Sequence, residues 1–137
     1  MMKRFLLILA ALFLLSSCEA LDIFGKDIML EPLSNVQSVR LYSYQNKDIK
    51  LSKEQKDAIV TEMNERLKSP WYQYFGKISN SCLVLQVEDN GRTRSFHIYE
   101  NGRLEASIGG HGGAASKAYA APDSMIKKLY DESEKCY

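Results

Sequence analysis

Residues 82–108, CLVLQVEDNGRTRSFHIYENGRLEASI, contain three short apolar runs separated by two Asn-Gly pairs. Within each run the larger apolar side chains recur at every second position, which is the period of a β-strand with one buried face. Asn-Gly pairs favour the positive φ angles of tight hairpin turns. The segment therefore predicts a three-stranded antiparallel meander.

The first turn predicts the register of the first hairpin. A two-residue turn at Asn90-Gly91 sets Leu85 opposite Phe96, so that both side chains lie on one face of the sheet. The same register sets Leu83 opposite Ile98. A slip of one residue would move every one of these side chains to the other face.

The second turn requires a longer loop. A two-residue loop would put Leu104 on the polar face, whereas a three-residue loop over 100–102 aligns it with Ile98. We therefore expect the three-residue loop, with Gly102 in the left-handed region. The predicted buried face comprises Leu83, Leu85, Val87, Phe96, Ile98, Leu104, Ala106 and Ile108.

A helix is predicted before the meander. Ser52, followed three residues later by Gln55, has the pattern of a capping box at a helix start. Ser69-Pro70 predicts the helix end, because the residue before a proline disfavours the helical conformation. The predicted buried stripe, at helical spacing, is Ile59, Met63 and Leu67, supported by Val60.

The remaining elements complete an α+β fold. Residues 36–44 predict a first strand, residues 117–120 an optional short strand around Tyr119, and Pro122 the first turn of a final helix. The apolar side of that helix is Met125, Ile126, Leu129 and Tyr130. The predicted order is β-α-β-β-β-(β)-α, a small antiparallel sheet with two helices packed on one face.

Composition and charge restrict the class of partner. The chain has 137 residues, the length of a single domain, with 18 Lys and Arg against 17 Asp and Glu and a formal charge of +1. A nucleic-acid-binding face requires a basic patch, and attachment to anionic lipid by charge requires a basic cluster. The near-neutral balance argues against both modes of binding.

The N-terminus carries the most specific motif. Lys3-Arg4 precede the uncharged apolar run 5–15, and Ser16-Ser17 follow it. A basic start, an apolar run and small residues at its end are typical of a secretory signal. As a helix the run would span about 16 Å, roughly half a bilayer core, so a membrane-spanning segment is disfavoured. Leu15-Ser16-Ser17-Cys18 resembles the lipobox of bacterial lipoproteins.

This resemblance implies cleavage and lipid anchoring. In bacterial lipoproteins the cysteine thiol is diacylated, the peptide before it is removed, and the new amino group is usually acylated too. It therefore implies a signal over 1–17 and a mature chain beginning at acylated Cys18, in the lipid bilayer of the cell envelope. Glu19 stands where Asp would signal inner-membrane retention in enterobacteria, which implies an outer-membrane protein facing the periplasm. An ordinary secretory signal with a chance cysteine is the alternative.

The mature chain divides into a tether and a domain. Residues 18–35 are expected to form the lipidated N-terminus and tether, and residues 36–137 a single α+β domain. Cys82 and Cys136 remain as an even number of cysteines in an oxidising compartment, which favours a disulfide. Such a bridge would contribute about 4 kcal/mol. Two unpaired thiols are the alternative.

An aromatic run supplies the candidate binding surface. Trp71, Tyr72, Tyr74 and Phe75 follow the helix end, and exposed tyrosine is typical of binding surfaces. In the alternative interpretation two of them, Trp71 and Phe75, fill the core. The glycine-rich segment around His111 lacks the spacing of a phosphate-binding loop, but loops on rigid scaffolds often carry function. The candidate surface is therefore Trp71, Tyr72, Tyr74 and His111.

No catalytic constellation is found. The predicted register sets His97 opposite Glu105, which we interpret as a solvated cross-strand pair. A zinc site from His97, His111, Cys82 and Cys136 would lack the usual ligand spacing. No nucleophile or acid–base motif is present. We expect no metal, no cofactor and no catalytic residue.

These features favour a membrane-anchored, non-enzymatic module of the cell envelope that binds another protein, with inhibitor and immunity roles included. Binding to nucleic acid is not expected. An outer-membrane assembly or structural accessory is the alternative. A small-ligand binder, or an enzyme acting on envelope fragments, is the less favoured one.

Overall fold

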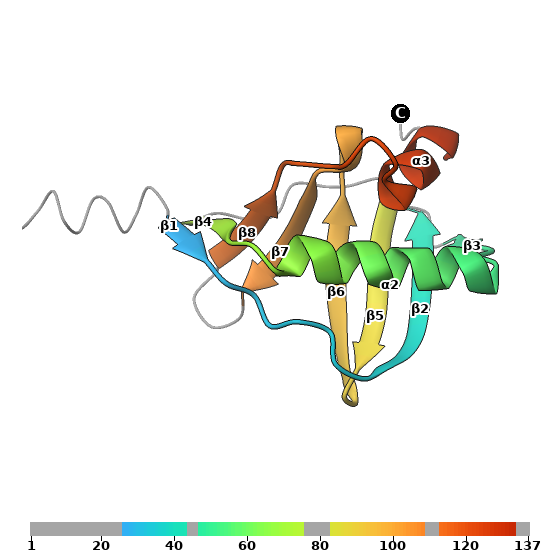
Figure 1. Ribbon diagram of the computed structural model, residues 1–137, viewed down its shortest axis with the longest axis horizontal. Coiled ribbons are helices and arrows are strands. Elements are labelled where there is room, and N and C mark those ends of the chain that lie inside the picture. The colour runs from blue at the N-terminus through green and yellow to red at the C-terminus, as the bar shows by residue number, and fades with distance from the viewer. Residues whose placement is uncertain (1–25, 44–46, 76–82, 109–112, 134–137) are drawn as a thin grey trace, which may run out of the picture.

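In the part of the chain that the structure describes, eight antiparallel strands form one sheet, and two helices pack on it (Figure 1). The computed structural model describes residues 26–43, 47–75, 83–108 and 113–133. The strands are β1 Lys26–Ile28, β2 Val36–Ser43, β3 Asp48–Ile49, β4 Trp71–Phe75, β5 Leu83–Asp89, β6 Arg92–Ile98, β7 Leu104–Ile108 and β8 Gly113–Lys117. The helices are α2 Lys53–Leu67 and α3 Met125–Glu132, with a 3₁₀ turn, η1, at Glu100–Gly102. Across the sheet the order is β1-β4-β8-β7-β6-β5-β2-β3. The predicted α+β class is confirmed.

The meander of β5, β6 and β7 has the predicted register. Asn90 and Gly91 have φ angles of 52° and 74°, which fit the two-residue turn, and Leu85 pairs with Phe96. At the second turn Gly102 has a φ of 72°, and Ile98 pairs with Leu104. Both hairpin predictions are therefore confirmed.

The two turn glycines are expected to differ in their tolerance of a side chain. A left-handed residue other than glycine costs about 1–2 kcal/mol, and this applies to both Gly91→Ala and Gly102→Ala. A Cβ at Gly91 meets nothing within 4 Å, whereas one at Gly102 lies 3.0 Å from the Cβ of Ala120 and 3.2 Å from that of Lys127. Overpacking adds about 1–3 kcal/mol. Urea unfolding should therefore show the larger loss for Gly102→Ala; equal losses would contradict the close packing of η1 on α3.

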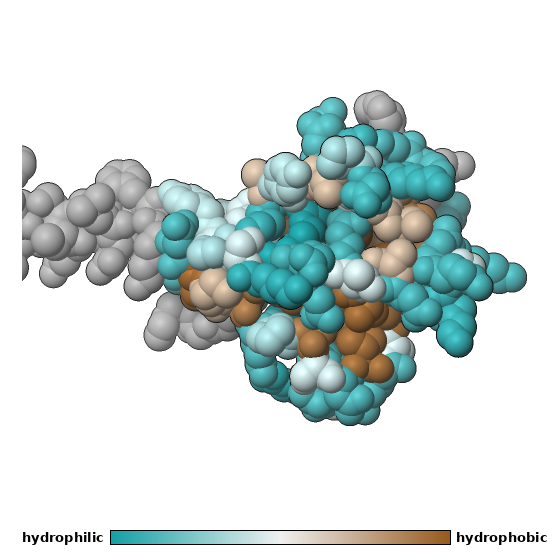
Figure 2. All heavy atoms as spheres, in the orientation of Figure 1, coloured by the Kyte–Doolittle hydropathy of each residue, from teal (hydrophilic) through white to brown (hydrophobic). Residues whose placement is uncertain are grey.

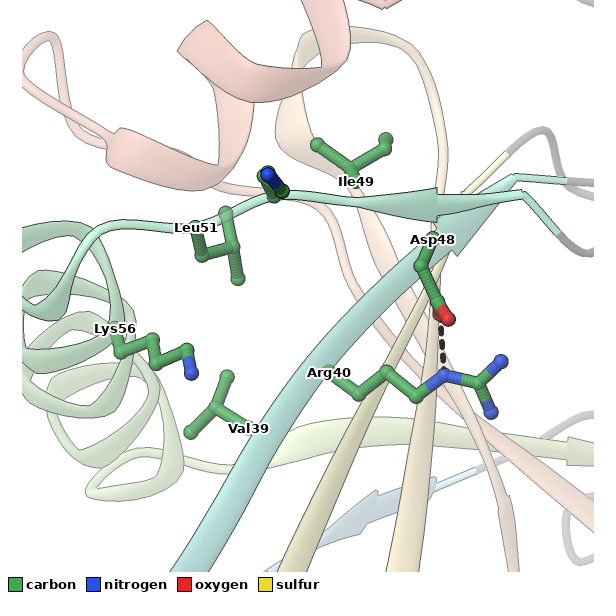
Figure 3. Close-up of a pocket in the computed structure, with 7 residues that line it drawn as sticks. Val39, Arg40, Asp48, Ile49, Leu51 and Lys56 are labelled. Carbon is green, nitrogen blue, oxygen red and sulfur yellow. Dashed lines mark hydrogen bonds and ion pairs between the residues drawn. The ribbon is translucent and has the colours of Figure 1, made fainter.

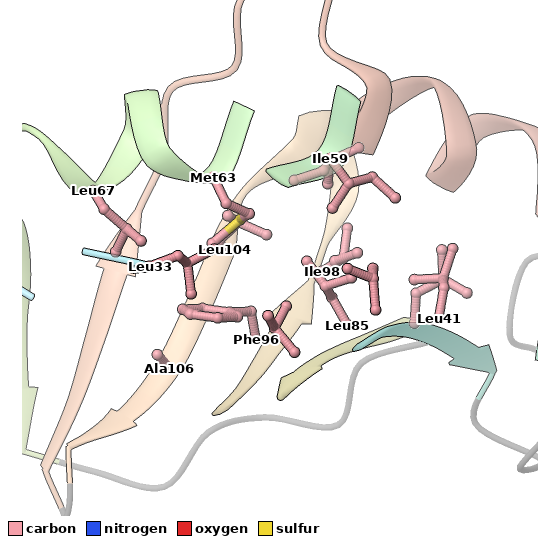
Figure 4. Packing of buried hydrophobic residues seen from close by; sticks show 14 of the residues in the cluster. Leu33, Leu41, Ile59, Met63, Leu67, Leu85, Phe96, Ile98, Leu104 and Ala106 are labelled. Atoms are coloured by element: carbon pink, nitrogen blue, oxygen red, sulfur yellow. The ribbon is translucent and has the colours of Figure 1, made fainter. Parts of the chain in front are cut away.

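Helix α2 begins and packs as the sequence predicts. The Ser52 hydroxyl accepts from the Gln55 N–H at 3.1 Å, and the Gln55 side chain accepts from the Ser52 N–H at 2.9 Å. These two bonds form the capping box. Ile59, Met63 and Leu67 are each at most 1% exposed and face the sheet (Figure 4).

One hydrophobic core lies between the helices and one face of the sheet. Figure 4 shows Ile59, Met63 and Leu67 above Phe96 and Leu104. Ile126 and Leu129 of α3 belong to the same cluster, so both helices lie on the same face. The predicted buried face of the meander is confirmed: Leu83, Leu85, Val87, Phe96, Ile98, Leu104 and Ala106 are buried, and Ile108 is partly buried.

The expected tether is partly folded, which corrects the predicted domain boundary at residue 36. β1 pairs with β4, and Leu33 is 7% exposed within the core. The Leu33 N–H donates to Asn64 Oδ1 of α2 at 3.2 Å. Residues 26–35 therefore belong to the domain.

The aromatic segment is also different from its predicted form. Residues 71–75, for which no strand is predicted from the sequence, form β4 between β1 and β8. The optional fourth strand of the prediction lies at Gly113–Lys117 instead of residues 117–120. Both differences have the same cause. β4 and β8 pair with each other although they are far apart in the sequence, and this pairing stabilises both strands.

Helix α3 starts later than predicted. Ser124, not the region of Pro122, is its N-cap, and the Ser124 hydroxyl accepts from the Lys127 N–H at 3.0 Å. Glu62 of α2 accepts from the Ser124 hydroxyl at 2.7 Å and from the Ile126 N–H at 3.2 Å. A carboxylate from a neighbouring helix thus satisfies the first turn of α3. Among the described helices, none is long and apolar enough to cross a membrane.

Candidate functional site

The sheet face that points away from the helices, here called the outer face, carries a row of polar and aromatic side chains. Side chains alternate between faces along a strand, so Tyr72 lies on the opposite face from buried Trp71. Strand pairing then sets Tyr72 beside Ser116, Ser116 beside Glu105, and Glu105 beside His97. The row crosses four adjacent strands in the centre of the sheet.

Glu105 is buried in this row. It is 5% exposed, and its Oε1 accepts from the Arg103 guanidinium at 2.5 Å. Arg103 also lies over the Tyr99 ring, 4.2 Å from its centroid. The register of His97 and Glu105 is therefore as predicted, but the solvated pair is wrong for Glu105, whose charge is compensated by Arg103 instead of by water.

Tyr72 and Tyr74 form a stacked pair beside Glu105. Their ring centroids are 6.5 Å apart with an interplanar angle of 19°. Tyr72 is 49% exposed, whereas Tyr74 is partly buried. Burial raises the pKa of Tyr74 to about 12, and its interaction with the Glu105 carboxylate adds to the shift. The phenol therefore stays protonated at neutral pH and can donate a hydrogen bond.

His97 is the side chain of this surface whose ordinary pKa lies closest to pH 7. Burial lowers its pKa below the ordinary 6.5, and the Glu105 carboxylate opposes that shift. The imidazole is therefore neutral at pH 7. Because folding lowers the His97 pKa, protonation of His97 favours the unfolded chain. The free energy of unfolding is therefore highest above pH 6.5 and decreases as the pH falls through the folded-state pKa.

We expect the His97 pKa to report on Glu105 directly. The chain has two histidines, so NMR titration of the imidazole C–H signals, assigned with His97→Gln, should give a His97 pKa below 6.5. Glu105→Gln should lower the His97 pKa further, because the substitution removes the carboxylate charge that raises this pKa. An unchanged or raised pKa in Glu105→Gln would contradict the packing of these two side chains.

Together these residues make the outer-face cluster: Tyr72, Tyr74, His97, Tyr99, Arg103 and Glu105. A cavity of about 570 Å³ adjoins it, lined by Tyr99, Glu100, Asn101, Arg103, Ala118 and Tyr130. The cluster thus offers aromatic rings around a neutralised ion pair. Such a surface suits recognition by stacking and hydrogen bonding more than recognition by net charge.

A second hollow lies at the β3 edge of the sheet, beside β2 and the start of α2 (Figure 3). Val39, Ile49 and Leu51 form its apolar lining, with Lys56 at its side, and its volume is about 220 Å³. Figure 2 shows further hydrophobic atoms at the surface below α2. Arg40 at the rim is bound to Asp48 at 2.5 Å. This hollow is smaller and has no buried charge among its lining residues.

The structure places only some residues of the predicted candidate surface on the outer face. Tyr72 and Tyr74 lie on the outer face, but placing Trp71 with them is wrong, because Trp71 is 0% exposed and its indole N–H donates to the Arg66 carbonyl at 2.9 Å. His111 lies outside the described residues, as do Cys18, Cys82, Cys136 and the Phe75 side chain. The predicted lipidation and disulfide therefore stay predictions.

Sequence reasoning missed Tyr99, Arg103 and the burial of Glu105. Their positions beside the second Asn-Gly turn resemble those of ordinary solvent-exposed turn residues. The available signal was the i, i+2 spacing of Arg103 and Glu105, which puts two opposite charges on one face of a central strand.

Comparison with family models, curated proteins and solved structures finds no match to the chain. In the described part of the chain, no three His, Cys, Asp or Glu side chains are grouped as metal ligands. The geometry of the outer face and the N-terminal motif therefore carry the functional information in this chain.

Proposed function

We propose that this chain is a cell-envelope lipoprotein, anchored through acylated Cys18, whose outer face binds another protein as an inhibitor or immunity protein does. The observation that carries the binding role is the outer-face cluster, in which Arg103 stacks on Tyr99 next to the stacked Tyr72–Tyr74 pair. Tyrosine and arginine held in fixed positions are typical of interface hot spots. The lipobox-like sequence supports the anchor.

The electrostatics of the cluster support binding without strong charge steering. Glu105 and Arg103 compensate each other, and His97 and Tyr74 are neutral at pH 7. A partner would therefore be selected by shape, stacking and hydrogen bonds. Glu105 is already buried, and desolvating the partly exposed Arg103 beside its partner carboxylate costs less than desolvating a free charge.

Site-specific photo-crosslinking tests which face is used. Ser107 is exposed and lies on the outer face of β7, two residues after Glu105, whereas Thr61 is exposed on α2. A photo-reactive residue at Ser107 of the membrane-anchored protein should give one defined protein adduct, and the same residue at Thr61 should not. Adducts at Thr61 alone, or none at Ser107, would contradict the proposal.

A pair of arginine variants tests the hot spot. Lysine cannot reproduce the planar stacking of a guanidinium on an aromatic ring. Arg103→Lys should therefore lower the Ser107 adduct yield by about fivefold or more, the effect of a hot spot above roughly 1 kcal/mol. Arg92→Lys, at a side chain that is 61% exposed and paired with Glu31, is the matched control and should leave the yield unchanged.

The cavity beside Tyr99 favours a second candidate, a binder of small envelope fragments. Two tyrosines and Asn101 in its lining give it both stacking and hydrogen-bonding groups. Binding of cell-wall fragments that is abolished by Tyr130→Ala, without any protein adduct at Ser107, would favour this candidate over the protein partner.

A further inference from the structure

Three large hydrophobic side chains are exposed in the described part of the chain: Met29 at 56%, Tyr72 at 49% and Tyr119 at 70%. Met29 directly follows β1, Tyr72 is in β4, and Tyr119 is two residues beyond β8. These strands are the first three in sheet order, and Figure 1 shows them together at one side of the molecule. The three exposed side chains therefore lie on or just beyond neighbouring strands at one side of the sheet, with Tyr119 next to Ala120, which packs on Gly102 of η1.

Strand register puts them at the same end of these strands. Ile28 pairs with Trp71, so Met29 leaves β1 where β4 begins. Tyr72 pairs with Ser116, so Tyr119 continues past the same end of β8. Neighbouring strands are about 4.8 Å apart, which separates β1 from β8 by roughly 10 Å. We call the group of Met29, Tyr72 and Tyr119 the hydrophobic corner.

The length of chain before β1 links this corner to the membrane. Seven residues, 19–25, separate Cys18 from Lys26. A fully extended chain of that length reaches about 28 Å at most. If Cys18 is acylated, as the proposed function requires, the β1 edge stays within this distance of the bilayer surface, whereas β3 is at the opposite edge of the sheet.

We propose that the hydrophobic corner lies in the bilayer interface and sets the orientation of the domain on the membrane. Tyrosine is enriched at this depth because its ring is apolar and its hydroxyl remains hydrated. Lys117, beside the corner, binds the hydroxyl of Ser69 and the carbonyl of Pro70, which places a cation at headgroup level. The acyl chains supply the anchoring energy, and the corner supplies the orientation.

This orientation restricts the partner. Tyr72 belongs to both the hydrophobic corner and the outer-face cluster, where it stacks on Tyr74. The binding face thus meets the bilayer at its β4 side. A partner on the outer face would therefore contact this chain close to the membrane surface, as a membrane-embedded or membrane-bound protein does.

Methionine methyl NMR tests the corner with controls that the chain itself provides. Once residues 1–17 are removed, the methionines are Met29, Met63 and Met125. Met63 is 0% exposed, and Met125 is partly buried on α3, away from β1 (Figure 1). The acylated protein is placed in nanodiscs of zwitterionic lipid carrying a lipid-borne spin label. The Met29 signal should lose most of its intensity, while Met63 and Met125 keep theirs.

Variants and the mass of the same sample separate the possible failures. The double variant Tyr72→Ser with Tyr119→Ser should recover part of the Met29 intensity, because the tether still keeps β1 near the bilayer while the domain loses its fixed orientation. Equal loss of the Met29 signal with and without the two substitutions would overturn the corner. An unchanged Met29 signal in a sample whose mass shows acylated Cys18 overturns the corner alone. A sample without acyl mass overturns the corner together with the proposed anchor.

Discussion

Trp71→Ala is expected to lower the free energy of unfolding by about 3–5 kcal/mol, a large share of the stability of a domain of this size. The indole is 0% exposed, and its ring lies 6.1 Å from that of Phe96 between α2 and the sheet. Alanine leaves a cavity there and leaves the Arg66 carbonyl without its indole donor. Urea unfolding followed by circular dichroism measures the loss without depending on the single tryptophan.

Tyr72→Ala is the matched control for this prediction, since the two residues are neighbours on β4 and differ in the face they occupy. Tyr72 is 49% exposed and stacks on Tyr74, so its replacement should lower stability by about 1 kcal/mol, well below the loss for Trp71→Ala. Equal losses for the two variants would mean that β4 does not separate a core face from an outer face.

Asp89→Ala is the second substitution with a large expected effect. Asp89 is 1% exposed, and its carboxylate accepts the Asn35 N–H at 2.6 Å and the Ser34 N–H at 3.0 Å. These bonds fix the segment that carries Leu33 into the core. Their loss removes two hydrogen bonds to a charged group, at about 1.5–3 kcal/mol each.

Glu88→Ala, at the exposed neighbouring position on β5, provides the comparison for Asp89. Asp89→Asn should be intermediate, because the amide keeps one acceptor oxygen. Amide hydrogen exchange gives a local measure: the Ser34 and Asn35 amides should exchange much faster in Asp89→Ala than in Glu88→Ala. Equal protection in the two variants would contradict the role assigned to this carboxylate.

Local chemistry explains which parts of the fold are predictable from sequence. The two hairpins and the start of α2 are determined by residues within a few positions of one another, such as Asn90-Gly91 and the Ser52–Gln55 capping box. In contrast, β4 is a strand because β1 and β8 pair with it from distant parts of the sequence. Trp, Tyr and Phe are enriched in strands, but nothing near residues 71–75 in the sequence indicates which strands pair with them.

The candidate site divides in the same way. The aromatic run pointed to Tyr72 and Tyr74, and the meander register set His97 opposite Glu105. The i, i+2 spacing of Arg103 and Glu105 indicates their contact, but the burial of Glu105 depends on the neighbouring strands, so that burial is visible only in the folded chain. Cross-strand spacing predicts neighbours, but it does not predict which of them water reaches.

The hydrophobic corner and the outer-face cluster are consistent with a single orientation of the proposed lipoprotein at the membrane. The acylated N-terminus would hold the β1 edge at the bilayer, and Tyr72 would connect that edge with the binding face. The small hollow near β3, lined by Val39 and Leu51, lies toward the opposite edge of the sheet. In this arrangement the outer face, and not that hollow, is the surface a membrane-bound partner reaches first.

Mass spectrometry of the protein purified from its native membrane tests the central claim most directly. We predict a mature chain that begins at Cys18, with the added mass of two or three acyl chains on its first residue. Acyl chains retained on the N-terminal peptide after proteolysis would place the modification. A chain that begins elsewhere, or a Cys18 of unmodified mass, would contradict lipid anchoring and the membrane-proximal binding derived from it.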